Sequence, residues 1–491
     1  MSRINTNVPS MTAQRVLGQQ NDLLNTSLNR LSTGLRINRG SDDPAGLIAS
    51  ETLRAEMQAI GAAMDNAERA EQVINVAEGG LQEINSLLLE VQSLVGQSAN
   101  DAGISEEEKE ANQLQVDSIL QTIDRIANST SFNGAKLLNG NFDYTTGNGD
   151  TAFTSGVRDV SIKSARLSND DDTDLAVTVD VTASAQTAGV YLTTSGGFTE
   201  SYTIEVTGVD GVQQFTFASG ASSADVATAV NSFTEALGVS ATTSGANVIV
   251  NSTGYGDDAF VKVKVLDSAS GEDSFVQGID DDGSLGTASS EVRDVGRDAS
   301  VQINGNQATV DGLVARVATD GFDVTVTLSA LSDLNSDGST AQFDITGGGA
   351  DFNLGPRVNL SNKVSLGIET VTTGNLGDAF EGFLSDLKTG GGSNLVDGDL
   401  TSGQKIVDAA ISQISSLRGR LGALTKNTVG ATLNNLAVTM ENTAAAESVI
   451  RDADFAQETA SLTRQQILSQ ASSQALQLAN QQPQQVLSLL G

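Results

Sequence analysis

Five residues between positions 333 and 344 have the types and spacing of the first half of a calcium-binding loop. They are Asp333, Asn335, Asp337, Gly338 and Asp344. Alternating oxygen-bearing side chains followed by a turn-forming glycine would present hard oxygen ligands to Ca²⁺, with the last carboxylate at the twelfth position. A solvated turn is favoured instead, because the preceding segment is strand-like and Thr340 stands where an aliphatic residue is usual.

The composition removes most catalytic chemistry. The 491 residues include no Cys and no His, so the chain has neither a thiolate nor an imidazole. Most zinc sites and the Ser-His-Asp and Cys-His catalytic systems are therefore excluded. A zinc peptidase domain within the chain is also excluded, because it needs a His-Glu-x-x-His helix. A hydrolase that uses only Asp and Glu stays formally open, but the sequence predicts a protein that is not an enzyme and has no cofactor.

The charge balance points away from nucleic acids and membranes. The chain carries 61 acidic and 27 basic residues, a net charge of -34, which repels phosphate backbones and anionic lipid surfaces. No apolar stretch approaches the length of a membrane span, and residues 1–16 lack the apolar core of a secretory signal. The sequence therefore predicts either a cytosolic protein or one exported by an unusual route.

Two segments, one toward each end of the chain, have the heptad spacing of a coiled-coil seam. The first seam consists of Ile60, Ala63, Ala67, Ala70, Ile74, Ala77, Leu81, Ile84, Leu88, Val91 and Val95. The second consists of Val407, Ala410, Ile414, Leu417, Leu421 and Leu424. Neither seam can be buried alone, so the chain should leave a helical bundle, form another structure for about 300 residues and return to complete the bundle.

Helix-start signals accompany the first seam. Asp43 is a candidate N-cap, and Pro44 occupies the first helical position, where its missing N–H costs nothing. The helix that follows can run to about Gln97. A second helix is expected after Ser105, because Glu108 three residues later completes a capping box.

The middle of the chain has a different character. Residues 141–395 carry a net charge of -24 and are rich in Gly, Thr, Asp and Val. Apolar and polar residues alternate in the segments 174–184, 202–217, 246–254, 260–266 and 322–328. The sequence therefore predicts a turn-rich antiparallel β region of one or two domains between helical flanks, which makes the chain an α+β multidomain protein.

The two ends of the chain have weaker helical patterns. Apolar stripes run through Leu17, Leu24, Leu28, Leu31 and Leu35 at the start and through Leu468, Ala471, Ala475 and Leu478 at the end. Residues 465–491 contain no charged residue and nine Gln, so they have neither salt bridges nor much apolar surface with which to fold alone. We expect both ends to become ordered only by packing on each other and on other copies of the chain.

Several stretches of this sequence resemble bacterial flagellin. They are MSRINTNVPSMTAQRVL at the start, SLNRLSTGLRINRGSDDPAGLIAS at 27–50, SFNGAKLLNG at 131–140, RDADFAQETASLTRQQIL from residue 451, and the closing NQQPQQVLSLLG. In the middle, residues 232–265 look like a short module inserted in many flagellins and hook-associated proteins. The matched motifs stand in the same order as in the family, which makes the resemblance specific at both ends of the chain.

The resemblance implies a plan for the chain. In the family, paired terminal helices form an inner tube and a surrounding coiled-coil layer, and the middle projects outward as β domains. The implied boundaries are 1–43 for the N-terminal helix of the inner tube, 44–170 for the N-terminal part of the coiled-coil core, 171–390 for the outer β-rich domains with the inserted module near 232–265, 391–450 for the C-terminal part of the core, and 451–491 for the C-terminal helix of the inner tube.

The resemblance also implies a function and partners. The chain would be the structural subunit that self-assembles into the extracellular filament of the bacterial flagellum used for swimming, after type III export in an unfolded state. Its partners would be other copies of itself, hook-associated and cap proteins, and an export chaperone at the C-terminal tail near Leu487, Leu489 and Leu490. The alternative is a hook-filament junction or related axial protein present in few copies.

Specific residues can be assigned to assembly. The expected self-assembly residues are Leu17, Leu24, Leu28 and Leu31 packed against Leu468, Ala471, Ala475 and Leu478 as the inner wall. The expected coiled-coil core residues are Ile60, Ile74, Leu81, Ile84, Leu88, Val91, Ile414, Leu417, Leu421 and Leu424.

A further expectation concerns the Toll-like receptor that senses flagellins. The flagellins that it senses resemble this chain at residues 87–100 and 113–126, and alignment on QSAN and IDR places their receptor-contacting Arg, Leu and Glu at Glu90, Leu94 and Gln115. Replacing the arginine fork by a carboxylate implies weak or absent recognition. Alternatively, Glu90 merely tunes packing between neighbouring subunits.

Overall fold

The protein is described by a computed structural model that covers residues 6–100, 103–167, 174–193, 201–245, 247–268, 275–278, 285–330, 334–378 and 380–490, with side chains as far as residue 482. The chain divides into two compact units. The terminal unit comprises Met1–Glu71, Asn353–Asn362 and Leu424–Gly491, and the central unit comprises Gln72–Phe352 and Lys363–Ala423.

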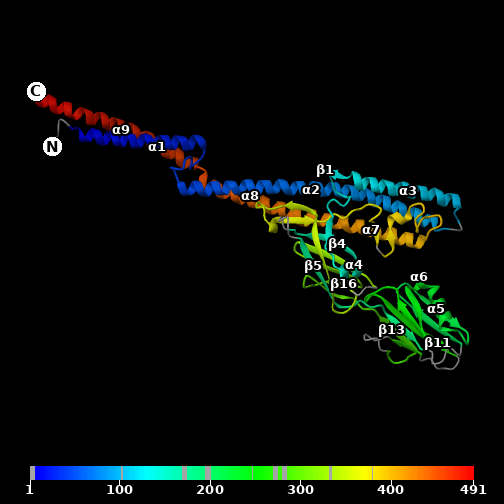
Figure 1. Cartoon of the computed structure of the whole chain (residues 1–491). Helices are drawn as coiled ribbons and strands as arrows, with labels where there is room; N and C mark the ends of the chain where they lie inside the picture. The colour runs from blue at the N-terminus through cyan, green and yellow to red at the C-terminus, as the bar shows by residue number, and fades with distance from the viewer. Residues whose placement is uncertain are drawn as a thin grey trace. The chain divides into compact units, whose positions relative to one another are not determined.

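Long helices form the two ends of the chain and strands form its middle (Figure 1), which confirms the predicted α+β class. The helices are α1 (Val8–Thr33), α2 (Pro44–Ser98), α3 (Glu106–Ser129), α4 (Thr151–Gly156), α5 (Ser223–Asn231), α6 (Thr234–Leu237), η1 (Leu360–Asn362), η2 (Leu384–Leu387), α7 (Leu400–Ala423), η3 (Leu424–Val429), α8 (Gly430–Arg451) and α9 (Phe455–Leu490).

The strands fall into several sheets. They are β1 (Ser131–Phe132), β2 (Ala135–Lys136), β3 (Tyr144–Gly147), β4 (Val157–Ala165), β5 (Leu175–Ala183), β6 (Gly189–Leu192), β7 (Tyr202–Thr207), β8 (Val212–Phe217), β9 (Val239–Ser244), β10 (Asn247–Ser252), β11 (Phe260–Ser268), β12 (Val276–Gly278), β13 (Glu291–Val295), β14 (Ser300–Ile303), β15 (Asn306–Gln307), β16 (Thr309–Asp311), β17 (Val314–Thr319), β18 (Phe322–Leu328), β19 (Ser339–Gly348), β20 (Ala350–Asn353), β21 (Lys363–Leu366), β22 (Gly377–Asp378) and β23 (Gly382–Phe383). Neighbours such as β9 and β10, β17 and β18, or β5 and β19 are antiparallel.

The first coiled-coil seam lies on the buried face of α2. Its members are between 0% and 2% exposed from Ile60 to Val95. In the second seam, Val407, Ala410, Ile414 and Leu421 of α7 are fully buried and Leu417 is 6% exposed. Leu424 is half-buried, because it begins η3, the π-helical turn that separates α7 from α8.

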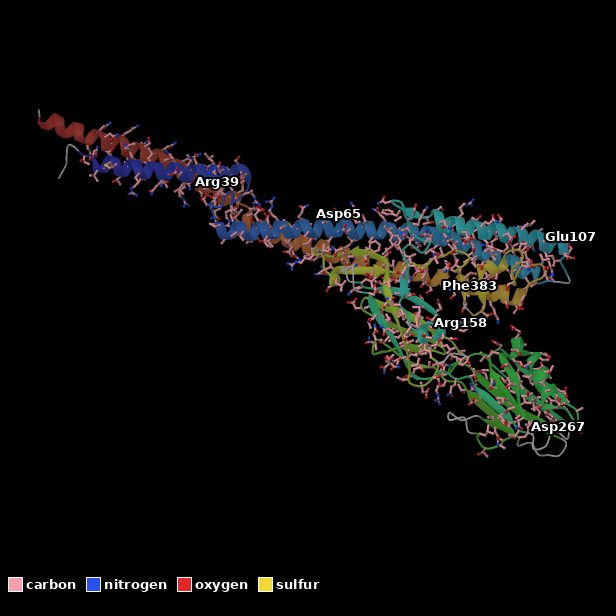
Figure 2. The ribbon with its side chains drawn as sticks, viewed as in Figure 1. Arg39, Asp65, Glu107, Arg158, Asp267 and Phe383 are labelled. Carbon is pink, nitrogen blue, oxygen red and sulfur yellow. The ribbon has the colours of Figure 1, made fainter. Side chains whose placement is uncertain are left out.

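The helix starts form as the sequence predicts. The Asp43 carboxylate accepts a hydrogen bond of 2.9 Å from the backbone N–H of Gly46 at the start of α2. At the start of α3, Ser105 and Glu108 each accept from the backbone N–H of the other, which is a capping box. Polar side chains face solvent on both helices: Asp65 and Glu107 are exposed (Figure 2).

The first β-sandwich of the central unit combines a five-stranded sheet, β15-β14-β5-β19-β3, with a four-stranded sheet, β16-β17-β18-β4. Inward side chains of both sheets belong to one core, exemplified by Val179 on β5, Phe343 on β19 and Val326 on β18. The strands β3 and β4 precede residue 170, so this β structure begins earlier than the predicted outer region. The reason is that neither strand has a clean alternation in the sequence.

The second β-sandwich has its own core. It combines the sheets β12-β6-β10-β9 and β13-β11-β7-β8, and the inward residues of α5 add to its interior. The module-like segment 232–265 therefore contributes α6, β9, β10 and part of β11 to a larger sandwich that also needs β6, β7 and β13.

The chain enters and leaves the second sandwich at one place. Gln186 and Arg297 pair through two backbone hydrogen bonds, in which each N–H donates to the other's carbonyl at 2.8 and 2.9 Å. Gly296 lies so close to its neighbours that a Cβ there would collide with the backbone oxygens of Gly256 and Gln186. The second sandwich is thus an insertion whose two ends meet.

This closeness leads to a prediction about excision. Replacing residues 187–296 by Asn-Gly should let Gln186 and Arg297 close a two-residue hairpin, because a hydrogen-bonded antiparallel pair accepts such a turn. The shortened chain should keep its helical circular dichroism and still polymerise. Loss of cooperative unfolding in the remaining chain would show that the second sandwich is required by its neighbours.

Candidate functional site

Helices α1 and α9, from opposite ends of the chain, lie side by side in the terminal unit (Figure 1). Polar pairs set their antiparallel register. The contacts are Ser10 Oγ donating to Asn480 Oδ1 at 2.7 Å, Asn7 Nδ2 donating to the Ala479 carbonyl at 2.9 Å, Ser469 Oγ donating to Asn21 Oδ1 at 3.0 Å, Ser27 Oγ donating to Gln465 Oε1 at 3.0 Å, and the Arg30–Glu458 ion pair at 3.1 Å. These pairs fix the two ends against each other through side chains that the heptad pattern does not single out.

The connections beyond the two helices also pair. α1 ends at Gly34, whose φ of 75° places it in the left-handed region that glycine tolerates. The carbonyl of Gly34 accepts from the N–H of Ala453 at 2.9 Å, and the N–H of Arg36 donates to the carbonyl of Arg451 at 2.6 Å. The turn that closes α8 is therefore joined to the turn that closes α1.

The loop before α2 is held by a capped carboxylate. Asp42 Oδ2 accepts backbone hydrogen bonds from Arg39 at 2.8 Å and from Asn38 at 3.1 Å. These two N–H donors stabilise the charged form and hold the pKa of Asp42 below its ordinary value. The loop has the sequence RINRGSDDP, which lies within one of the stretches that carry the family resemblance.

The predicted self-assembly residues differ in exposure between α1 and α9. On α1, Leu17, Leu24 and Leu31 are half-buried. On α9, Leu468 and Leu478 are 43% and 61% exposed, and Ala471 and Ala475 are also exposed. Within one chain, the less exposed face of α9 combines polar residues such as Ser469 with Leu476 and Ala479, whereas the predicted apolar stripe on α9 is exposed.

A set of large apolar side chains remains exposed on this helix pair. The set, called here the terminal apolar surface, consists of Val8, Met11, Leu23, Leu28, Phe455, Ile467, Leu468 and Leu478, each between 43% and 68% exposed. So many large apolar side chains exposed on one pair of helices are typical of a surface that another chain covers.

A second feature escaped the sequence analysis: one face of α3 holds the segment that returns to α7. Gln113 Nε2 donates to the Leu387 carbonyl at 2.8 Å, and its Oε1 accepts from the Leu395 N–H at 2.7 Å. Asp117 accepts from the Thr389 N–H at 3.0 Å. The return segment thus packs on the helical core before residue 390, where the predicted outer region ends.

Further along the same face of α3, Asp124 holds the return segment at a second point. It accepts from the N–H and the hydroxyl of Thr373 at 2.8 and 2.9 Å and contacts Lys388 Nζ at 3.4 Å. The spacing of Gln113, Asp117 and Asp124 places them on one side of a helix. Polar residues at helical spacing are the only sequence signal that could have indicated these contacts.

The buried amide of Gln113 supports a prediction. Gln113→Ala should lower the free energy of unfolding by about 2–4 kcal/mol, because it leaves two buried backbone groups without partners. Gln115→Ala, at an exposed position two residues later, should cost less than about 0.5 kcal/mol. Urea unfolding followed by circular dichroism measures both. Equal midpoints would mean that water replaces the Gln113 amide.

The candidate calcium residues serve a turn. Asp333 lies outside the described residues. Asp337 Oδ1 accepts from the N–H of Ser184, and Asn335 Oδ1 accepts from the N–H of Ala185, both at 2.8 Å. Asp344 is on β19. Among the residues that the structure describes, no group of three or more acidic, His or Cys side chains is arranged to hold a metal ion.

The three positions aligned with receptor contacts differ in burial. Glu90 on α2 and Gln115 on α3 are exposed. Leu94 is only 6% exposed, because it lies beside Val91 and Val95 on the buried side of α2. The leucine that the alignment retains is therefore a core residue in this chain. Over the described part of the chain, no helix is long and apolar enough to cross a membrane.

Comparison with known proteins agrees with this arrangement. Residues 4–143 match the bacterial flagellin N-terminal helical region, and residues 404–490 match the bacterial flagellin C-terminal helical region. Across 99% of both chains, the sequence is 30% identical to flagellin from Salmonella rubislaw, and also across 99% of both it is 28% identical to flagellin A from Helicobacter pylori.

Among solved structures, the flagellar junction protein FlgL from Legionella pneumophila shares 13% identity with a TM-score of 0.25, covering 83% of this chain and 99% of that one. A structural likeness at that level does not identify a family, whereas the full-length sequence matches do. The chain belongs to the bacterial flagellin family, and it is a structural subunit of the flagellar filament rather than an enzyme.

Proposed function

We propose that the terminal apolar surface is where copies of this chain contact each other in the filament. The observation that supports this is a difference in burial: the apolar side chains of the two seams are buried within one chain, whereas many of those on the terminal helices are exposed. The seams of α2 and α7 are closed within one chain, whereas α1 and α9 meet through polar pairs and leave apolar side chains such as Met11 and Leu478 in water. Burying those side chains against neighbouring copies gives assembly its driving force.

A helical reconstruction of filaments formed by the purified chain tests this proposal. Met11, Leu23, Leu28, Ile467 and Leu478 should each lose most of their exposed area between copies. Filaments in which these residues stay exposed would contradict the proposal. Growth that stops at small oligomers would instead favour the alternative, a junction or related axial protein present in few copies.

Other partners follow from membership of the family. We place the finished subunit outside the cell, after type III export in an unfolded state, with hook-associated and cap proteins as neighbours at the ends of the filament. We assign the export chaperone to the uncharged tail, whose apolar residues need a cover before assembly. The side chains of Leu487, Leu489 and Leu490 lie outside those that the structure describes.

Recognition by the Toll-like flagellin receptor is expected to be weak or absent. Glu90 and Gln115 are exposed, so any receptor group that pairs with the family's arginine or glutamate would meet a carboxylate or an amide instead. Burial of Leu94 removes the third contact from the monomer surface. The exposure of Glu90 is equally compatible with a role in packing between subunits.

The receptor expectation is tested with a reporter assay on the monomer. Glu90→Arg combined with Gln115→Glu should restore part of the signal, because both substitutions recreate the charges found in sensed relatives. Strong signalling by the unaltered chain would rule the expectation out. If the double variant assembles poorly and does not signal, Glu90 acts in subunit packing rather than in evading the receptor.

A further inference from the structure

Two crossings of the chain form a neck between α7 and the first β-sandwich in the central unit. The outward crossing is 138–144 and the inward crossing is 367–371. Backbone hydrogen bonds join them: the N–H of Ile368 donates to the Phe142 carbonyl at 2.9 Å, and the N–H of Val371 donates to the Leu138 carbonyl at 3.0 Å. The described β-rich part of the chain lies between these crossings, so the neck holds it to the helices.

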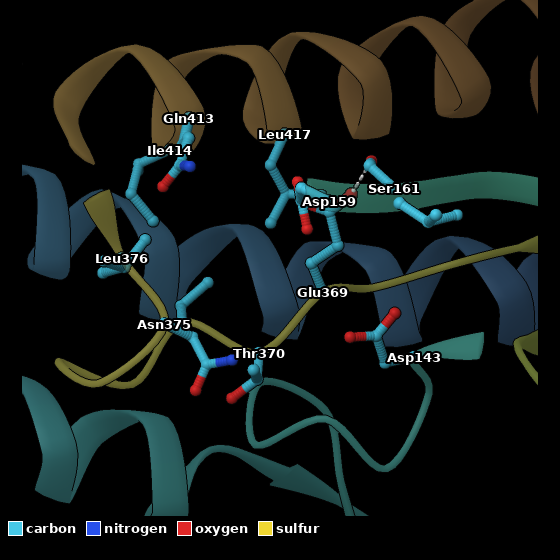
Figure 3. A pocket seen from close by; sticks show the side chains of 12 residues that line it. Asp143, Asp159, Ser161, Glu369, Thr370, Asn375, Leu376, Gln413, Ile414 and Leu417 are labelled. Atoms are coloured by element: carbon cyan, nitrogen blue, oxygen red, sulfur yellow. Dashed lines mark hydrogen bonds between the residues drawn. The ribbon is translucent and has the colours of Figure 1, made fainter. Parts of the chain in front are cut away.

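A cavity of about 140 Å³ lies beside the neck and is lined by carboxyl groups from three elements. Asp143 comes from the outward crossing, Glu369 from the inward crossing and Asp159 from β4 (Figure 3). Gln413 and Leu417 of α7 close its other side. Three acids thus surround one small space with apolar and amide neighbours.

Few partners neutralise these acids. Glu369 Oε1 accepts a hydrogen bond from the Ser161 hydroxyl at 2.5 Å. The nearby cation is Arg420 of α7, but its Nη2 donates to the Gly367 carbonyl at 2.7 Å, and its Nε and Nη1 are buried with no hydrogen-bond partner. Of the other charged or titratable groups nearby, Asp378 acts directly on Asp159. Lys163 interacts with Glu369, and Arg316 and Asp323 act on that lysine. Tyr144 interacts with Arg420, and Asp351 acts on the tyrosine.

Burial and neighbouring negative charge raise the pKa values of the carboxyl groups beside the neck. Desolvation, followed by the charge of Glu369, raises the pKa of Asp143 from 3.8 to about 6, against the smaller effects of two backbone N–H donors and Arg420. Desolvation also raises the pKa of Asp159, with Glu369 and Asp378 adding to it. Because the closed neck binds a proton more tightly than an open one, protonation favours closure and rising pH favours opening.

We propose that the Asp143 carboxyl group is a proton-operated latch on the neck: the protonated acid keeps the two crossings paired, and the ionised acid promotes their transient opening. The latch acts on the attachment of the β-rich part to the helical core and leaves the terminal helices unchanged. Solution acidity would in this way control how firmly the outer part of each subunit is held.

Hydrogen exchange measured by mass spectrometry tests the latch. Peptides that cover 138–144 and 367–371 are followed at pH 5 and pH 7, with each rate divided by its intrinsic exchange rate. A pKa that moves from 3.8 in the open neck to about 6 in the closed neck predicts an opening constant roughly tenfold larger at pH 7 than at pH 5. Asp143→Asn, which is neutral at both pH values, should reduce this ratio severalfold, and the pH dependence that remains is assigned to Asp159.

Two further variants make the test specific. Asp311→Asn, at an exposed position on β16, should keep the roughly tenfold ratio of the unaltered chain. Glu369→Gln keeps an acceptor for Ser161 but removes the repulsion on Asp143, so it should shrink the ratio. The proposal is overturned if the unaltered chain shows equal opening at both pH values, or if Asp143→Asn retains the full ratio. Should Asp143→Asn fail to fold, the unaltered chain and Glu369→Gln decide between the two outcomes.

Discussion

A chain that lacks residues 465–491 is expected to remain folded in its central unit and to form no filaments. The deletion removes the α9 partners of Ser10, Asn21 and Ser27, so α1 loses most of the polar contacts that set its register. It also removes Ile467, Leu468 and Leu478 from the terminal apolar surface. With these three side chains gone and α1 unpaired, the apolar area available for association falls, and assembly should lose much of its driving force.

Light scattering and electron microscopy measure the effect of this deletion on assembly, and circular dichroism checks the fold. The helical signal should fall by no more than the part contributed by the terminal helices, and cooperative melting of the rest should persist. A matched control replaces Gln466, Gln470 and Gln474 by Glu, which adds charge but keeps α9. Filaments of normal length from the deleted chain would remove α9 from the assembly mechanism.

The second large effect is expected at the seam of α2. Leu81→Asp and Ile84→Asp each place a carboxylate at a position that is 0% exposed. Each should lower the free energy of unfolding by about 4 kcal/mol or more, because an unpaired charge has to be desolvated and the apolar contact is lost. The same substitutions should prevent assembly, since they disrupt the helices of the core.

Glu83→Gln provides the contrast on the same turn of α2. Glu83 is exposed, so its neutralisation should cost less than about 0.5 kcal/mol. Thermal melting of the three variants separates the two faces of the helix. Equal melting temperatures would mean that the buried face has been assigned to the wrong side.

The helical seams could be predicted because their signal is local. Each buried position repeats at three or four residues, and the caps at Asp43 and Ser105 depend on neighbours within the same turn. The strands of the middle are similarly local: β18 occupies 322–328, the segment in which alternation predicts a strand. Periodicity therefore identified most of the elements that tertiary structure later brings together.

The pairing between distant segments could not be predicted in this way. The α1–α9 register depends on serine, asparagine and glutamine side chains that any exposed helix would also carry, such as Ser27 and Gln465. The order of strands in the two sandwiches depends on where the chain crosses, for example at Gln186 and Arg297. A residue such as Gln113 gains its role only when the return segment lies on it, and no local pattern encodes that approach.

The pairing of α1 with α9 also sets the order of events during synthesis. Asn7 and Ala479, which contact each other in the folded chain, are 472 residues apart. At ordinary rates of translation, that distance corresponds to roughly 25 to 95 s between the emergence of one helix and of its partner. Prematurely terminated products would carry α1 without α9 and would lack half of the terminal apolar surface. On the proposed role of the terminal apolar surface, such products should not be incorporated into the filament.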